Sequence, residues 1–186
     1  MKKGKRMSHP AGVNALLLAG GLVCSTFIVA AADQDNVRFH GTLVAKPCRL
    51  DAGSEDFEVA FGSVIDKNLY SNGRTGGKAL EIRLKECNLA VWNSVKVTFT
   101  GAESAALPGL LAVSGTSGVS GVAIGLETLS GKALKVNTAG ERQQLTSGDT
   151  TIGMQAYVQG EPDAISGRKI VPGEFSVTAT FALEYE

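Results

Sequence analysis

The chain has 186 residues, of which 44% are hydrophobic and 19% charged, and its 18 basic residues balance its 18 acidic residues. Four of the basic residues lie within the first six positions, whereas every acidic residue follows Ala32, so the chain beyond Ala32 carries a net charge of −4. A mildly acidic chain without a basic stripe is a poor candidate for binding nucleic acid, and no apolar run after Ala32 approaches the length that spans a membrane.

The first 32 residues have the layout of a secretory signal peptide. The basic start MKKGKR precedes a mostly apolar run over residues 13–29, and the small-residue run VAAA closes it at residues 29–32. This order predicts export, with cleavage after Ala31 or Ala32. A membrane anchor is the disfavoured alternative, because Gly and Ser interrupt the apolar run and a cleavage site follows it. Cleavage leaves about 154 residues, enough for one domain with its own core.

Loss of the leader removes Cys24 and leaves two cysteines, Cys48 and Cys87. In an exported protein an isolated pair is most simply one disulfide. The bond closes a loop of about 40 residues, which the chain-entropy model values at roughly 4 kcal/mol. Metal binding is the rival interpretation, but neither cysteine lies in a CxxC motif and His40 is the one histidine beyond the leader. We therefore expect a Cys48–Cys87 disulfide and no metal site.

Apolar and polar residues alternate along almost every patterned segment of the chain, which is typical of half-buried strands. The alternating segments, in chain order, are residues 37–43, 57–61, 80–84, 95–99, 122–126, 152–158 and 175–185. Turn-rich stretches separate them, at residues 71–77, 114–121, 130–132 and 146–150. No window shows a helical period long enough to predict a helix. Residues 130–136 have the pattern of the turn and return strand of a hairpin, and residues 137–145 have that of a polar loop. The pattern predicts one all-β sandwich domain.

The last alternating segment is also the end of the chain. Its apolar positions are Phe175, Val177, Ala179, Phe181, Leu183 and Tyr185, and no turn or further strand follows them. The sequence therefore predicts a long, half-buried strand that finishes the domain in the middle of a sheet.

No set of residues has the composition of a catalytic site. The segment NGRTGGKA departs from a phosphate-binding loop, because Asn72 replaces the first Gly and Ala79 replaces the Ser or Thr that would hold a metal ion. His40 falls on the polar face of its segment, and Glu55, Asp56 and Glu58 read as the solvated start of a strand. We expect no enzyme, catalytic residue or cofactor, and the sequence favours a role in binding or assembly.

Several segments together resemble the pilins of the bacterial chaperone–usher pathway. They are GTLVAKPC before and around Cys48, the GVAIGLET hairpin at residues 121–128, and the terminus VPGEFSVTATFALEYE. Gly173 is the fourteenth residue from the end and Tyr185 is the penultimate aromatic, a combination that resembles the chaperone-recognition signature of this family. The segments GAESAALPG and IVPGEFSVTATFALEY are most similar to the minor adaptor subunit of the P-pilus tip.

The resemblance implies a fold and a mode of assembly. It implies an immunoglobulin-like sandwich that lacks its last strand and is completed by a donor strand in trans, first from a periplasmic chaperone and then from the next subunit. The implied groove and chaperone handle consist of Gly173, Phe175, Val177, Ala179, Phe181, Leu183, Tyr185 and Glu186. The implied donor arm is residues 33–45, with Val37, Phe39, Gly41 and Leu43 entering a neighbour's groove, and the pilin domain is residues 46–186.

The resemblance also implies partners and a location. The partners are the chaperone, the outer-membrane usher and neighbouring subunits, and the chain passes through the periplasm to a pilus on the cell surface. We expect a minor tip or adaptor subunit. Two alternatives stay open: a terminating or anchoring subunit of the same pilus, and a free-standing exported β-sandwich that binds carbohydrate. Residues 36–44 have an alternative role as the first strand of their own domain.

Overall fold

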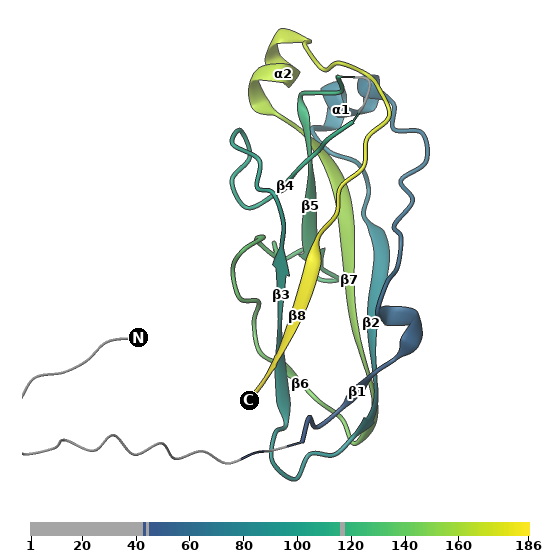
Figure 1. Cartoon of the computed structure of the whole chain (residues 1–186). Helices are drawn as coiled ribbons and strands as arrows, with labels where there is room; N and C mark the ends of the chain where they lie inside the picture. Colours follow the sequence, from purple (N-terminus) through teal and green to yellow (C-terminus); the bar gives the residue numbers. More distant parts are fainter. Residues whose placement is uncertain (1–42, 44, 116–117) are drawn as a thin grey trace, which may run out of the picture. The chain divides into compact units, whose positions relative to one another are not determined.

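The computed structural model describes residue 43 and residues 45–115 and 118–186. The expected leader and the arm positions Val37, Phe39 and Gly41 lie outside the described residues. Leu43, the last of the expected arm positions, is fully exposed. The strands of the described chain form two antiparallel sheets (Figure 1), as the alternating pattern predicted.

The first sheet has five strands in the order β1-β2-β7-β5-β4, and the second has three in the order β6-β3-β8. The first sheet consists of β1 (Arg49–Leu50), β2 (Lys78–Cys87), β7 (Gly148–Gly160), β5 (Val122–Thr128) and β4 (Leu111–Ala112). The second consists of β6 (Gln143–Gln144), β3 (Ser94–Thr100) and β8 (Thr180–Tyr185). The strands that the sequence placed at 80–84, 95–99, 122–126 and 152–158 are thereby confirmed.

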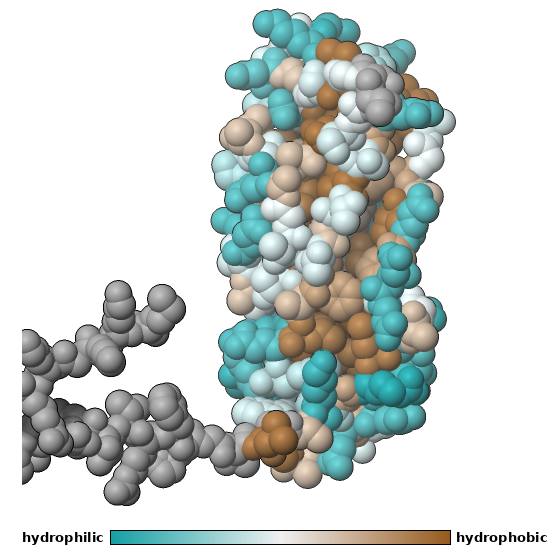
Figure 2. Space-filling model, in the orientation of Figure 1, coloured by the Kyte–Doolittle hydropathy of each residue, from teal (hydrophilic) through white to brown (hydrophobic). Residues whose placement is uncertain are grey.

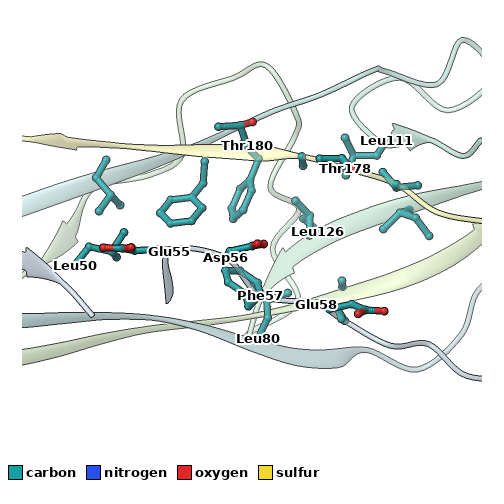
Figure 3. A pocket seen from close by; sticks show the side chains of 18 of the residues that line it. Leu50, Glu55, Asp56, Phe57, Glu58, Leu80, Leu111, Leu126, Thr178 and Thr180 are labelled. Atoms are coloured by element: carbon teal, nitrogen blue, oxygen red, sulfur yellow. The ribbon is translucent and has the colours of Figure 1, made fainter. Parts of the chain in front are cut away.

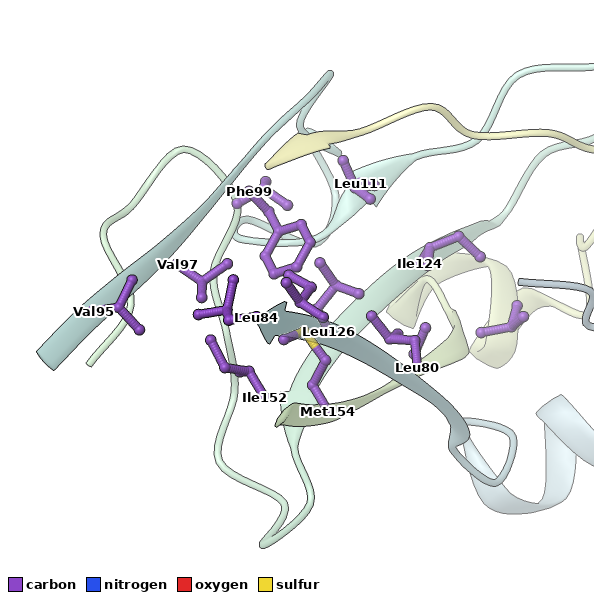
Figure 4. Close-up of a cluster of buried hydrophobic side chains, with 14 of the residues drawn as sticks. Leu80, Leu84, Val95, Val97, Phe99, Leu111, Ile124, Leu126, Ile152 and Met154 are labelled. Carbon is purple, nitrogen blue, oxygen red and sulfur yellow. The ribbon is translucent and has the colours of Figure 1, made fainter. Parts of the chain in front are cut away.

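The core lies between the facing sides of the two sheets (Figure 4). β2 contributes Leu80, Ile82 and Leu84, which are at most 6% exposed, while the residues between them are exposed. β3 and β7 follow the same period, because in a strand successive side chains point to opposite faces. The buried side chains that Figure 4 labels come from β2, β3, β4, β5 and β7.

β5 departs from the alternation, because residues 122–127 are all buried. The ring of Tyr157 on β7 lies over Gly125, where a Cβ atom would come within 2.2 Å of it. The Arg74 guanidinium in turn lies 4.0 Å from the centre of the Tyr157 ring. The outer face of β5 is therefore covered by side chains, which the hydropathy pattern alone did not reveal.

Residues 57–61 are not a strand, contrary to the sequence expectation. Phe57, Val59 and Phe61 are partly buried and pack against the core. The alternating pattern therefore identified the buried side chains of this segment correctly. The segment nevertheless has no ladder partner among the described residues and runs as an irregular trace between η1 (Ala52–Ser54) and α1 (Asp66–Asn72) (Figure 1).

Two short helices also went unpredicted, α1 and α2 (Pro162–Gly167). Each has about two turns, which is too short to show a helical period. The local signals are present: Pro162 opens α2, and Gly73 ends α1 in the left-handed region at a φ of 76°. The hairpin expected at 130–136 forms its turn, but its return segment makes only a single bridge, between Glu127 and Ala133. The loop expected at 137–145 contains the short strand β6.

The terminal strand is shorter than the alternation predicted. β8 covers Thr180–Tyr185 and pairs with β3, with Phe181 opposite Phe99 and Leu183 opposite Val97. β3 ends at Thr100, so the residues before Thr180 leave its edge. Residues 175–179 make one isolated bridge instead, between Ser176 and Ser114. The chain therefore passes from the neighbourhood of Ser114, which follows β4 of the five-stranded sheet, to the edge of β3 in the three-stranded sheet.

The expected disulfide between Cys48 and Cys87 is confirmed. It joins the segment before β1 to the last residue of β2, and both cysteines are buried. The bond fixes the beginning of the described domain to the five-stranded sheet.

Candidate functional site

An apolar groove of about 980 Å³ runs beside the terminal strand. Two segments border it, and they are named here the terminal lip (residues 175–185) and the first lip (residues 55–61). Figure 2 shows the groove region as an apolar stripe along the face of the domain, with hydrophilic residues beside it. The floor includes core side chains of both sheets, among them Leu80, Phe99 and Leu126. The groove thus extends down to the core between the two sheets.

The terminal lip contains most of the groove residues that the sequence predicted. Phe175, Val177, Ala179, Phe181, Leu183 and Tyr185 all line the groove, and all but Ala179 are partly buried. Gly173 and Glu186 are not among the lining residues. Along β8 the even-numbered positions are exposed and the odd-numbered positions turn inward, which places one apolar row over the groove.

β8 is an edge strand within the part of the chain that the structure describes. It forms a ladder with β3 on one side only. Its other side faces the groove, where its backbone groups have no ladder partner among the described strands. An open edge of this kind is a template for pairing with another chain, because backbone N–H and C=O groups need hydrogen-bond partners.

The first lip was not recognised as part of a site from the sequence. Phe57 and Phe61 approach the terminal lip, with the Phe57 ring centre 6.3 Å from that of Phe181 and the Phe61 ring centre 6.3 Å from that of Phe175. Between and beside these rings stand three exposed acids, Glu55, Asp56 and Glu58, which also line the groove (Figure 3). They are solvated, as expected, but they belong to an irregular segment rather than to the start of a strand.

The last residue is held at the start of β3. The side-chain carboxylate of Glu186 pairs with Lys96 and, at 2.7 Å, with Arg142. These two contacts, with the hydrogen bond from Lys96 as the larger cause, lower the pKa of Glu186. Its backbone oxygen accepts hydrogen bonds from the Ser94 amide at 3.2 Å and the Ser94 hydroxyl at 3.0 Å. The end of the terminal lip is therefore fixed in place, and burial raises the pKa of the adjacent Tyr185.

The described residues contain no group of three or more His, Cys, Asp or Glu side chains that could hold a metal ion. None of the described helices is both long and apolar enough to cross a membrane. The groove is thus the feature of the described chain with the clearest capacity to bind a partner.

Known proteins resemble this chain in sequence and in architecture. Residues 37–186 match the family described as "Fimbrial protein". The chain is 34% identical to the fimbrial adapter PapK of Escherichia coli, over 92% of this chain and 96% of that protein. It is 32% identical to the fimbria A protein of Serratia marcescens, over 94% of this chain and 99% of that protein.

A solved structure gives the same result. The fold superposes on the P pilus rod subunit PapA with a TM-score of 0.66 at 25% sequence identity, covering 76% of this chain and all of that one. The chain belongs to the fimbrial protein family. It has the immunoglobulin-like pilin fold and is a structural subunit of a chaperone–usher pilus, a fibre on the cell surface whose subunits are exported through the periplasm. The family is non-enzymatic.

Proposed function

We propose that the chain polymerises by donor-strand exchange, in which a strand from another subunit fills its groove. The observation that carries the proposal is the edge strand β8 beside an open apolar groove of about 980 Å³. A strand laid there would pair with β8 and cover the apolar floor. Burying four or five apolar side chains in the groove is worth on the order of 1.5–3 kcal/mol each, which is comparable to the whole stability of a domain.

The donor in this scheme is the N-terminal arm of a neighbouring subunit. We propose that residues 1–32 are removed as a signal peptide, that residues 33–45 are the arm, and that residues 46–186 are the pilin domain. Val37, Phe39, Gly41 and Leu43 would enter the groove of the next subunit, with the residues between them facing outward. The full exposure of Leu43 is compatible with a residue that finds its apolar partner on another subunit.

Before assembly the groove needs a temporary partner. We propose that a periplasmic chaperone fills this role and that the exchange takes place at the outer-membrane usher.

Co-expression with the chaperone tests whether the terminal strand is the segment that the chaperone recognises. Changing Tyr185 to Asp places a charge in the groove, where an unpaired charge costs several kcal/mol, so co-purification should be lost. A short extension past Glu186 should have the same effect. Glu184→Gln, which changes an exposed residue of the same strand, is the control. Unchanged yields for both altered chains would place the chaperone handle elsewhere.

Within the pilus we propose two candidate positions, of which the first is that of a minor tip adaptor. The support is the 34% identity to PapK along almost the whole of both chains. An adaptor joins two different kinds of subunit, so it is expected once in each fibre. Immunogold labelling of purified pili should then give a single particle close to one end.

A repeated subunit is the second candidate. Its support is the similarity to the rod subunit PapA, together with 31% identity to the major MR/P fimbria protein of Proteus mirabilis over 92% of this chain and 97% of that one. In that position the gold particles would follow the length of the fibre. The labelling pattern therefore separates the two positions, and neither pattern affects the donor-strand proposal.

A further inference from the structure

The two lips of the groove differ in charge. The first lip brings three acids to the groove, Glu55, Asp56 and Glu58, and all three are exposed. The polar residues that the terminal lip brings to the groove, Ser176, Thr178 and Thr180, are all uncharged. Figure 3 shows two of them, Thr178 and Thr180. Lys46 is the one basic residue among those that line the groove, so the lining carries three acids against one base.

None of the three acids pairs with a basic side chain among the described residues. Seven ion pairs connect side chains of the described residues, and none of them includes Glu55, Asp56 or Glu58. A strand lying between the lips would direct one row of side chains into the groove and the other row outward, beside these acids. Opposite charges on neighbouring strands stabilise a sheet, and like charges destabilise it. The first lip should therefore favour a strand with basic outward residues and disfavour an acidic one.

The N-terminal arm of this chain has that pattern. With Val37, Phe39 and Gly41 directed inward, the outward row of residues 33–43 is Gln34, Asn36, Arg38, His40 and Thr42. This row contains one permanent positive charge, at Arg38, and no acid. The two acids of the arm, Asp33 and Asp35, fall on the inward row and precede the apolar positions. The arm thus presents the charge that the first lip lacks.

We propose that the first lip selects the incoming strand by charge, and that its occupant is residues 33–45 of a second copy of this chain, with Arg38 beside Asp56 and Glu58. The inference rests on the proposed donor-strand exchange and adds the residues that determine its specificity. A groove that accepts its own arm lets one copy follow another, which favours the repeated position in the fibre over the adaptor position.

Competition between two peptides measures the selection directly. Residues 33–186, unfolded with the disulfide intact, are refolded at low concentration in a large and equal excess of two differently labelled peptides of residues 33–45, one natural and one with Arg38→Glu. The excess keeps the arms of other copies from filling the groove. The ratio of the two labels in the soluble complex gives the preference. We expect the natural peptide in roughly five- to tenfold excess at low salt, from one or two cross-strand charge pairs. High salt should bring the ratio toward one, because exposed charges are screened. An Arg38→Lys peptide should compete equally with the natural one.

Variants of the lip assign the preference to its acids. Neutralising them together, as Glu55→Gln, Asp56→Asn and Glu58→Gln, should bring the ratio close to one. The matched control neutralises three exposed acids that do not line the groove, as Glu81→Gln, Glu141→Gln and Asp163→Asn, and should keep the excess of the natural peptide. Reversing the lip, with Asp56→Lys and Glu58→Lys, should make the Arg38→Glu peptide the preferred one.

The possible failures are distinguishable. If both peptides are retained equally by the natural chain at low salt, or if the neutralised lip keeps the preference, the charge selection is wrong and donor-strand exchange stands. If neither peptide is retained under any salt condition, the groove does not accept this arm, and the proposed exchange between copies fails with the inference.

Discussion

Phe57 and Phe181 face each other across the groove, with their ring centres 6.3 Å apart and their planes tilted by 39°. Phe181 belongs to β8, whereas Phe57 belongs to a segment without a ladder partner among the described strands. Aromatic pairs at this separation attract each other beyond the gain from burial alone. The first lip is therefore held in place by side chains rather than by a backbone ladder, which leaves its backbone free to pair with an incoming strand.

Removing the Phe57 ring should weaken the strand-filled domain more than the open one. The ring is partly buried in the open groove, and a donor strand would cover it further. Phe57→Ala should cost about 2 kcal/mol in the filled form, below the 3–5 kcal/mol of a fully buried ring. Denaturant unfolding of the domain with and without an arm peptide measures both values, with Glu81→Ala, an exposed acid outside the groove, as the control. An equal, small loss in both forms would mean that the first lip does not contact the donor.

This lip also shows where sequence reasoning succeeded and where it stopped. Alternation reports which face of a segment is buried, so it located β2, β3 and β7 and the inward row of β8. The same alternation at Phe57, Val59 and Phe61 gave the buried side chains correctly but a strand that does not form, because a ladder needs a neighbour as well as a pattern. The groove lies between this segment and residues far along the chain. A local sequence pattern cannot show that two such distant segments lie side by side.

The outer face of β5 carries an ion pair between a buried carboxylate and a partly exposed arginine, and this pair should control stability. Arg74 donates two hydrogen bonds to the Glu127 carboxylate, at 2.9 and 2.7 Å, and Gln155 donates a third at 2.8 Å. Glu127 is 3% exposed. Arg74→Met would leave this carboxylate buried without its counterion and should cost about 2–3 kcal/mol. Arg83→Met, which removes an exposed pair with Glu81, should cost little. Equal losses in the two variants would contradict a special role for Glu127.

The same pair predicts a pH dependence. Its hydrogen bonds with Arg74 lower the pKa of Glu127 below the ordinary value of 4.5. A carboxyl group whose pKa is lowered by folding adds stability above its unfolded-state pKa and loses it as the pH falls through the folded-state pKa. The stability difference between the natural chain and Arg74→Met should therefore be full at neutral pH and shrink below about pH 4.5. Denaturant midpoints measured across this range give the difference, and a gap that widens on acidification would contradict the prediction.

The disulfide should contribute substantially to the stability of the groove. Cys48 lines the groove and Cys87 ends β2, at a sequence separation of 39. Replacing both with Ala removes the constraint on the unfolded chain and should cost roughly 4 kcal/mol. Chemical unfolding of the double variant, beside the natural chain with and without a reductant, measures the loss. A double variant as stable as the oxidised natural chain would show that the bond is dispensable.

The most direct test of the incomplete sandwich is to supply the missing strand within the same chain. Residues 33–45 are fused after Glu186 through a short flexible linker, so that the arm can turn back beside β8 at a high effective concentration. The fused chain should be monomeric and should melt far above the unfused chain. Changing Val37 and Phe39 to Asp in the fused copy should abolish the gain, because a buried unpaired charge is costly. If the unfused chain is already a stable monomer whose melting temperature the fused arm does not raise, the groove is not a strand-binding site.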